Sequence, residues 1–485
     1  MKIQIQKTNS INTTNSLFYI EKSSEQLLAT AKLILSTKEF SYLKKCVDDT
    51  KKNIIVINRF DVQLFISVIS KPIQPEYMVL EKIRKTGNEL LRILNDFNTH
   101  ELILISNDFN KNEILALTEG IVLSSYRFLK YKTDITAAEN SLQKLEILSE
   151  QITNADILSQ SIILESVFAC RDFVNEPVCF LNTQTFAKQV VAMFKNTKAT
   201  VDVLNKTKIE SLKMNGLLSV NKGSVDPPAF IIIEWKPTNT KNKAPYVFVG
   251  KGLMYDTGGI NIKTAAGMET MKCDMSGGAG VVSALFAIAK SELPAYVIGL
   301  VPLTDNRPGG NALVPGDIIN YADNTKVEVL NSDAEGRLIL ADGLIYANKY
   351  KPELVITLAT LTGAAHAAIG KYGIVAMGKD SETEFQDLQK SGNEIFERLV
   401  EFPFWEEYDE LIKSDIADIK NIGGSVAGAI TAGKFLAHFA KCPIIHLDIA
   451  GPSFNEKPDN YRCQGGSGVG VRLLFNFIQN KSKTK

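Results

Sequence analysis

Apolar and polar positions alternate in two ways along this chain, and each way indicates a different element. Short apolar runs bounded by polar turns predict strands, and stretches with apolar positions every three or four residues predict helices. Both occur between residues 1 and 152, a mixture typical of an α/β domain. The expected strands are Lys2–Gln6, Ser16–Glu21, Asn53–Asn58, Gln63–Ser70, Glu101–Ser106 and Gln143–Leu148, and the expected helices are Ser24–Lys45, Glu76–Phe97 and Glu113–Leu129.

A long helical pattern follows at about residues 154–174, and Pro177 ends it because proline disfavours helix in the residue before it. Beyond Tyr246, strand-like runs alternate more sharply with helical patterns. Such units build a mostly parallel sheet flanked by helices. The expected strands are Tyr246–Gly250, Ala295–Leu303, Val327–Leu330, Leu354–Thr360 and Pro443–Ala450, and the helices are Gly278–Lys290, Arg337–Lys349 and Thr431–Ala440.

We therefore expect an α/β protein of two domains, since 485 residues are also long for one core. The smaller N-terminal α/β domain takes residues 1–152. The larger C-terminal domain, residues 153–485, carries the mostly parallel central sheet, and the helix at about 154–174 links the two.

Composition excludes several classes of protein. Lys plus Arg and Asp plus Glu both number 54, so nothing in the net charge favours nucleic acid as a partner. No apolar run approaches the roughly 20 residues of a membrane helix, and the start lacks the apolar core of a signal peptide. The six cysteines are scattered, as in reduced thiols. We expect a cytoplasmic protein without a membrane partner.

The scarcity of histidine narrows the metal chemistry. The chain has four histidines, and none belongs to an HExxH motif. Any metal would therefore be bound mainly by carboxylates, whose oxygens suit manganese, magnesium or zinc.

Acidic and basic residues gather in three loops that follow strands, where ligands bind in parallel sheets. Asp333 and Glu335 are two apart, so extended backbone turns both carboxylates to one side. Packed together with Asp256 and Asp274, they would repel one another unless cations intervene. Two divalent cations would balance four carboxylates. The loops are Lys251–Lys263, Met271–Gly278 and Asn331–Arg337.

Each of these residues alone has an ordinary structural interpretation. Asp274 precedes a helix and would serve as an N-cap, and Lys251 and Arg337 alone would be a surface lysine and a salt-bridge partner. The glycine-rich turn at Gly277–Gly278 is compatible with phosphate binding, although no GxxxxGK[ST] motif is present. The joint occurrence in three strand-end loops favours a catalytic site.

At these residues the chain closely resembles the leucyl aminopeptidase family, the cytosol aminopeptidases of peptidase family M17. The family signature Asn-Thr-Asp-Ala-Glu-Gly-Arg-Leu matches Asn331–Leu338 except at Ser332. Further likeness lies at Arg171–Pro177, Asp256–Gly259, Ala359–Ala364 and His446–Gly451, and it extends over about residues 154–479.

The resemblance implies a role for each matching residue. One cation would be bound by Lys251, Asp256, Asp274 and Glu335, and the other by Asp256, Asp333 and Glu335. Lys263 and Arg337 would be catalytic. Lys263 and six further residues would bind substrate: Met271, Asn331, Ala334, Thr360, Leu361 and Gly363.

The resemblance also implies a reaction. Two cations, Mn²⁺ or Zn²⁺, would share a hydroxide that attacks the first peptide bond, with bicarbonate held near Arg337. The Met271 side of the pocket favours Leu or Met at the substrate N-terminus, although Met271 equally suits core packing. Peptides would be the substrates, and six copies would form a homohexamer. The alternative is a DNA-binding or purely structural hexamer with secondary or no peptidase activity.

Overall fold

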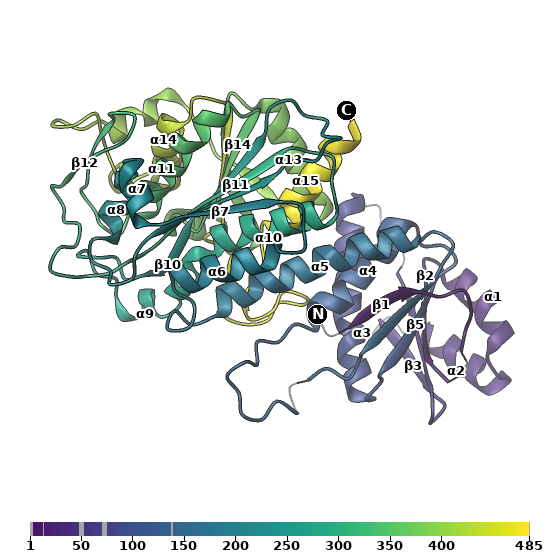
Figure 1. Ribbon diagram of the computed structural model, residues 1–485. Coiled ribbons are helices and arrows are strands. Elements are labelled where there is room, and N and C mark those ends of the chain that lie inside the picture. The colour runs from purple at the N-terminus through teal and green to yellow at the C-terminus, as the bar shows by residue number, and fades with distance from the viewer. Residues whose placement is uncertain (1–2, 13, 48–52, 70–74, 137–138, 485) are drawn as a thin grey trace. The chain divides into compact units, whose positions relative to one another are not determined.

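The computed structural model describes residues 3–12, 14–47, 53–69, 75–136 and 139–484. Lys2 and Ser70, the outer ends of two expected strands, lie outside these ranges. The chain forms two compact units (Figure 1): one comprises Met1–Glu165 with Lys457–Cys463, and the other Ser166–Glu456 with Gln464–Lys485. We expected the division after residue 152, and in the structure it falls inside helix α5 (Asn154–Asn175).

The first unit is built on a six-stranded sheet in the order β1-β6-β5-β2-β4-β3. Every neighbouring pair is parallel except β3 with β4. The strands are β1 (Gln4–Lys7), β2 (Ser16–Glu21), β3 (Ile54–Asn58), β4 (Gln63–Val68), β5 (Glu101–Ile105) and β6 (Lys144–Leu148), and the helices are α1 (Ser24–Ile34), α2 (Thr37–Val47), α3 (Glu76–Asp96) and α4 (Lys111–Ser124).

Two helices of this unit differ from the prediction. The single helix expected at Ser24–Lys45 is two helices, because Ser36 and Glu39 cap a new start: Ser36 N–H donates to Glu39 Oε2 (2.8 Å) and Glu39 N–H to Ser36 Oγ (3.4 Å). The helix expected at Glu113–Leu129 ends at Ser124, and Arg127 NH1 donates to the Ser124 carbonyl (2.8 Å) just beyond it.

The second unit contains a mixed sheet in the order β16-β15-β18-β14-β9-β11-β8-β7, with β10 paired to β11. Strands β18, β14, β9 and β11 are mutually parallel, so their carboxyl ends share one edge. The mostly parallel sheet predicted from the sequence is confirmed. The strands are β7 (Thr200–Leu204), β8 (Ala229–Trp235), β9 (Tyr246–Gly250), β10 (Gly252–Asp256), β11 (Val297–Asn306), β14 (Leu354–Ala359), β15 (Ile374–Lys379), β16 (Leu399–Glu401) and β18 (Ile444–Asp448).

Smaller sheets and helices complete this unit. One small sheet has the order β12-β13-β17, and β19 pairs with β20. The strands of these two small sheets are β12 (Ile318–Asn320), β13 (Lys326–Glu328), β17 (Ile419–Lys420), β19 (Phe454–Asn455) and β20 (Gly465–Gly466). The helices are α6 (Thr183–Phe194), α7 (Lys206–Ser211), α8 (Asn215–Asn221), α9 (Ala265–Met268), α10 (Ser276–Lys290), α11 (Gly336–Ala347), α12 (Gly363–Ile369), α13 (Glu382–Glu394), α14 (Gly428–Phe439) and α15 (Val471–Thr484).

Helices cover both faces of the central sheet (Figure 1). Side chains alternate between the faces of a strand, so Val249 and Gly299 take opposite sides. Val249 packs against Gly343 of α11, and Gly299 lies against Leu285 of α10. Across the described residues, no helix combines the length and the apolar character that a membrane span needs.

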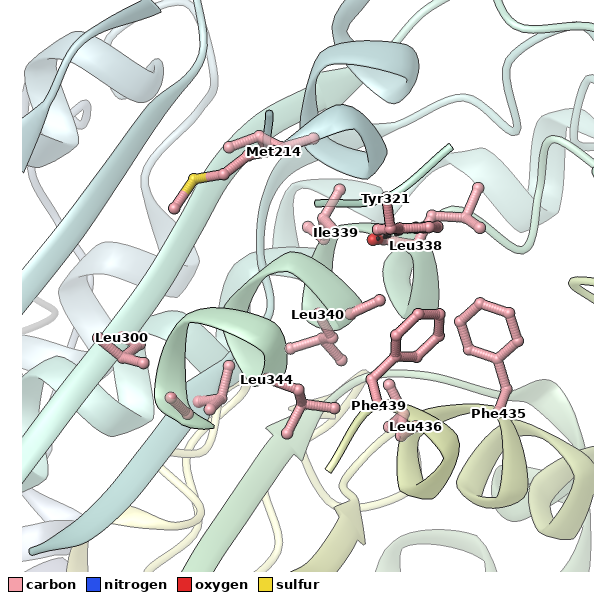
Figure 2. Packing of buried hydrophobic residues seen from close by; sticks show 14 of the residues in the cluster. Met214, Leu300, Tyr321, Leu338, Ile339, Leu340, Leu344, Phe435, Leu436 and Phe439 are labelled. Carbon is pink, nitrogen blue, oxygen red and sulfur yellow. Dashed lines mark hydrogen bonds between the residues drawn. The ribbon is translucent and has the colours of Figure 1, made fainter. Parts of the chain in front are cut away.

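Helix α11 is largely buried in the core of this unit. Leu338, Leu340 and Leu344 are buried, and they belong to one apolar cluster with Phe435 and Phe439 of α14 (Figure 2). Burying a leucine side chain contributes roughly 1.5–3 kcal/mol, so α11 is held firmly in place. The residues at its first turn are therefore presented from a rigid support.

Candidate active site

The edge of the central sheet and the buried helix α11 together position the acidic residues. Lys251 directly follows β9, Asp256 ends β10, and Asp274 lies in a 3-10 turn, Met271–Met275, that leads into α10. The third loop enters α11, whose N-cap residue is Glu335. Lys251 and Asp256 lie at strand ends, as expected from the sequence, whereas Asp274 lies between helices α9 and α10 and not after a strand.

Lys251 binds two of the carboxylates in a buried cluster. Its Nζ donates to Asp274 Oδ1 (2.9 Å) and lies 3.0 Å from Glu335 Oε1. It also donates to the Thr360 carbonyl (3.0 Å). Burial would lower the pKa of Lys251, but the carboxylates of Asp274, Glu335 and Asp256 outweigh burial and raise it. In the absence of a competing cation, Lys251 is therefore charged.

Lys263 binds the other two carboxylates. Its Nζ lies 2.7 Å from Asp256 Oδ2 and 2.5 Å from Asp333 Oδ1. Burial opposes a rise in the pKa of Lys263, but the contacts with Asp256 and Asp333 raise it. With Lys251, two ammonium groups face four acids, which leaves an excess of negative charge.

The donor set fits divalent cations. Asp256, Asp333 and Glu335 each offer a carboxylate oxygen within 4.8 Å of the others. Glu335 Oε2 is buried and accepts no hydrogen bond from any residue in the described ranges. Burial, together with the charges of Asp256 and Glu335, raises the pKa of Asp274 to about 8. A buried oxygen without a donor and a carboxyl that resists ionisation both indicate a place for added positive charge.

Gly336 leaves room for the Lys251 side chain. A Cβ atom at Gly336 would lie 2.5 Å from Lys251 Cε and 2.6 Å from its Nζ. Any larger residue would therefore displace the amine from its carboxylates.

Arg337 has few partners for a buried guanidinium. Its NH1 donates to the Asn421 carbonyl (2.8 Å), and its Nε is buried without a hydrogen bond to any described residue. Burial lowers the pKa of Arg337 to about 10, although Glu335 and Asp448 oppose this change. A cation with spare donors of this kind suits a small anion.

The residues expected to bind substrate lie beside this cluster. Thr360 Oγ1 donates to Asp274 Oδ1 (2.7 Å), and Asn331 Oδ1 accepts from Asp333 N–H (2.8 Å). Leu361 N–H donates to Asp448 Oδ1 (3.2 Å). All six are at least partly exposed: Met271, Asn331, Ala334, Thr360, Leu361 and Gly363.

Two buried asparagines that the sequence did not single out also belong to the site. Asn306, the last residue of β11, donates through Nδ2 to Asp256 Oδ1 (2.8 Å) and to the Ser332 carbonyl (3.0 Å). Asn421, just after β17, accepts from Leu330 N–H (2.8 Å) and donates to the Asn331 carbonyl (2.7 Å). In the sequence, Asn306 lies three residues beyond the strand expected to end at Leu303, and Asn421 belongs to no predicted element, so nothing marked either residue.

Comparison with known proteins gives close relatives. Residues 168–475 match the catalytic domain of the cytosol aminopeptidase family. A probable cytosol aminopeptidase of Chlorobium limicola is 41% identical over 381 residues, covering 76% of this chain and 75% of that protein. One of Chloroherpeton thalassium is 46% identical over 339 residues, covering 68% of this chain and 66% of that protein.

Solved structures agree in fold. The cytosol aminopeptidase from Coxiella burnetii matches with a TM-score of 0.83 at 24% identity and covers 99% of each chain. The bottromycin maturation enzyme BotP, in complex with Mn, matches with a TM-score of 0.84 at 25% identity, covering 96% of this chain and 99% of that one. On these matches, the chain belongs to the cytosol aminopeptidase family and is a hydrolase of peptide bonds.

Proposed function

We propose that this chain is a divalent-cation-dependent aminopeptidase that removes N-terminal residues from peptides. One observation carries the metal dependence: the carboxylates of Asp256, Asp333 and Glu335 converge with too few positive charges, and the buried Glu335 Oε2 has no donor among the described residues. The solved BotP structure contains Mn, which supports a cation of this type here.

The residues at the cluster suit two cations. Lys251, Asp256, Asp274 and Glu335 would hold one, and Asp256, Asp333 and Glu335 the other. Bound divalent cations supply Lewis acidity and make water a better nucleophile at neutral pH. Mn²⁺ and Zn²⁺ both accept carboxylate oxygens, so the donor set is compatible with either.

The chain's own groups then act on the substrate. The side chain of Lys263 is 18% exposed beside the cluster, so its ammonium would donate to the oxygen of the first peptide bond. A charged donor aimed at developing negative charge stabilises the transition state. Arg337 would hold a small anion such as bicarbonate, since its Nε has no partner in the described part of the chain.

The residues beside the cluster would line a substrate pocket. The 3-10 turn that carries Asp274 also carries Met271, which is partly exposed. Gly363 has no atom within 4 Å of where a Cβ would lie, so space remains beside Thr360 and Leu361. A pocket lined by Met271, Leu361 and the Thr360 methyl suits a Leu or Met side chain at the N-terminus of the peptide.

The test pairs a metal-content measurement with a panel of amide substrates. With Mn²⁺ the protein is expected to cleave leucine p-nitroanilide, and a chelator should stop it. Glu335→Ala should abolish turnover while the circular dichroism spectrum is unchanged. Glu234→Ala is a control, because Glu234 on β8 binds Tyr296 (2.9 Å) instead of the cluster. Substantial activity in Glu335→Ala would overturn the metal assignment.

The resemblance extends to assembly and location, and we propose a cytoplasmic homohexamer. Light scattering should then give a mass six times the 53.4 kDa of one chain. A monomeric mass together with full activity would overturn the hexamer and leave the catalytic proposal intact.

A further inference from the structure

The Asp256 carboxylate is oriented by neutral donors on one side only. Its Oδ1 accepts from Gly258 N–H (2.8 Å) and from Asn306 Nδ2 (2.8 Å). Two donors occupy the two lone pairs of that oxygen, so Oδ2 is the oxygen left for a cation. Oδ2 is also the atom that contacts Lys263.

Asn306 reaches a second loop through the same amide group. Its Nδ2 also donates to the Ser332 carbonyl, directly before Asp333. Ser332 Oγ in turn donates to the Gly258 carbonyl (2.7 Å), and Asn261 N–H donates back to Ser332 Oγ (2.9 Å). One amide thus fixes both the direction of Asp256 and the spacing between the two loops that carry Asp256 and Asp333.

The surroundings leave Asn306 little freedom. The residue is 3% exposed, and its carbonyl accepts from Thr257 N–H (3.0 Å) and Thr257 Oγ1 (2.8 Å). A Cβ on Gly259 would lie 2.7 Å from Asn306 Oδ1, so the amide is packed on that side as well.

We propose that Asn306 is a positioning residue that sets the affinity of the site for its cations. The inference rests on the proposed function, because it takes Asp256 as a metal ligand. Partners that orient metal ligands typically change metal affinity 10–100-fold when they are removed. The Asn306 amide orients the Asp256 carboxylate without adding charge, so its removal leaves the net charge of the cluster unchanged.

The chain offers a matched control at the other end of the same strand. Asn242 is also buried, and its Nδ2 donates to the carbonyls of Ala244 (2.8 Å) and Tyr296 (2.9 Å). Tyr296 precedes β11 and Asn306 ends it, so the two amides lie about 30 Å apart along the strand at roughly 3.3 Å per residue. Asn242→Ala removes a comparable set of bonds far from the cluster.

The experiment measures Mn²⁺ binding by titration calorimetry on the full chain. Asn306→Ala should weaken Mn²⁺ binding about 10–100-fold, and Asn242→Ala should bind as the parent does. Asn306→Leu, which keeps most of the volume and no donor, should bind as weakly as Asn306→Ala. If Asn306→Ala does not fold, the Mn²⁺ affinity of Asn306→Leu tests the proposal in its place. Thermal unfolding in a chelator shows how far each change affects the metal-free fold.

The outcomes separate this inference from the proposed function. Parent-like Mn²⁺ affinity in folded Asn306→Ala or Asn306→Leu overturns the positioning role, as does equal weakening in Asn242→Ala. A parent protein that binds no Mn²⁺ and cleaves no peptide overturns the proposed function itself.

Discussion

At the scale of single residues, the two lysines of the cluster have different partners and different expected roles. Lys251 is 2% exposed and contacts Asp274 and Glu335, so a cation bound there must displace its proton or its side chain. The side chain of Lys263 is 18% exposed and lies at the open side, where it can reach substrate. We therefore expect Lys251 to take part in binding the cation and Lys263 to take part in the reaction.

We expect Lys263→Met to separate these roles. The change removes a charged donor, and loss of one such donor typically lowers kcat about 100- to 1,000-fold. The carboxylates remain, so Mn²⁺ content should equal that of the parent. Steady-state kinetics and metal analysis check both points. Lys434→Met is the control, because this buried lysine pairs with Asp409 (2.9 Å) outside the cluster. Loss of Mn²⁺ from Lys263→Met would contradict the assignment.

A second residue-scale prediction concerns Glu21 in the first unit. Burial and a hydrogen bond with Asp108 raise the pKa of Glu21 to about 7. Asn107 Nδ2 donates to Glu21 Oε1 (2.8 Å), while the ammonium of the neighbouring Lys22 pairs with Glu113 (2.6 Å). The folded chain thus holds a proton that the unfolded chain releases above about pH 4.5, so stability should fall as pH rises toward 7.

Glu21→Gln should flatten this dependence, because an amide donates to Asp108 at every pH. Hydrogen exchange of β2 and β5 amides, corrected for intrinsic rates, gives the free energy of opening at pH 5 and pH 8. We expect the variant to gain stability over the parent at pH 8. Glu150→Gln, at an exposed position of the same unit, should follow the parent. A variant that retains the parent's full pH dependence would exclude Glu21 as its origin.

At the scale of elements, α11 offers two glycines with opposite expected effects. A Cβ on Gly336 meets the mobile end of Lys251, and a Cβ on Gly343 would lie 2.6 Å from Val249 Cγ1 in the core. Gly336→Ala should keep the fold and weaken Mn²⁺ binding at least about tenfold, because the amine is displaced. Gly343→Ala should lower the unfolding temperature through overpacking and leave the affinity unchanged. Equal affinities in calorimetry would contradict the role given to Lys251.

Elements could be predicted where one local cause determines them. β2 and β9 have the expected bounds because each is a continuous apolar run between polar residues. The strand expected at Ala295–Leu303 instead continues to Asn306, since pairing with β10 extends it. The strand expected to reach Leu330 ends at Glu328, because Leu330 N–H binds Asn421. Pairing between distant segments has no local signal.

The same distinction applies to the site. Acidic residues in three glycine-rich loops predicted a convergent cluster, and the structure brings Asp256, Asp333 and Glu335 together. Asn306 and Asn421 act through side-chain hydrogen bonds to residues far along the chain. Periodicity and composition carry no information about such partners.

At the scale of the whole molecule, the proposed cations concern one unit only. All the residues expected to bind metal lie in the unit Ser166–Glu456 with Gln464–Lys485. A ligand that binds only the folded form stabilises it by mass action, by about 2.7 kcal/mol at 100 times the dissociation constant. Mn²⁺ at that concentration should slow exchange of the most protected amides of β9, β14 and α11 by about 100-fold.

Amides of β2 and β5 in the other unit should exchange at the same rate with and without Mn²⁺, since that unit holds none of these residues. Glu335→Ala is the control, because it removes a carboxylate shared by both proposed cation sites and should abolish the protection. Hydrogen exchange read by mass spectrometry reports both units in one sample. Equal slowing in both units, or slowing that survives Glu335→Ala, would place the cation elsewhere in the chain.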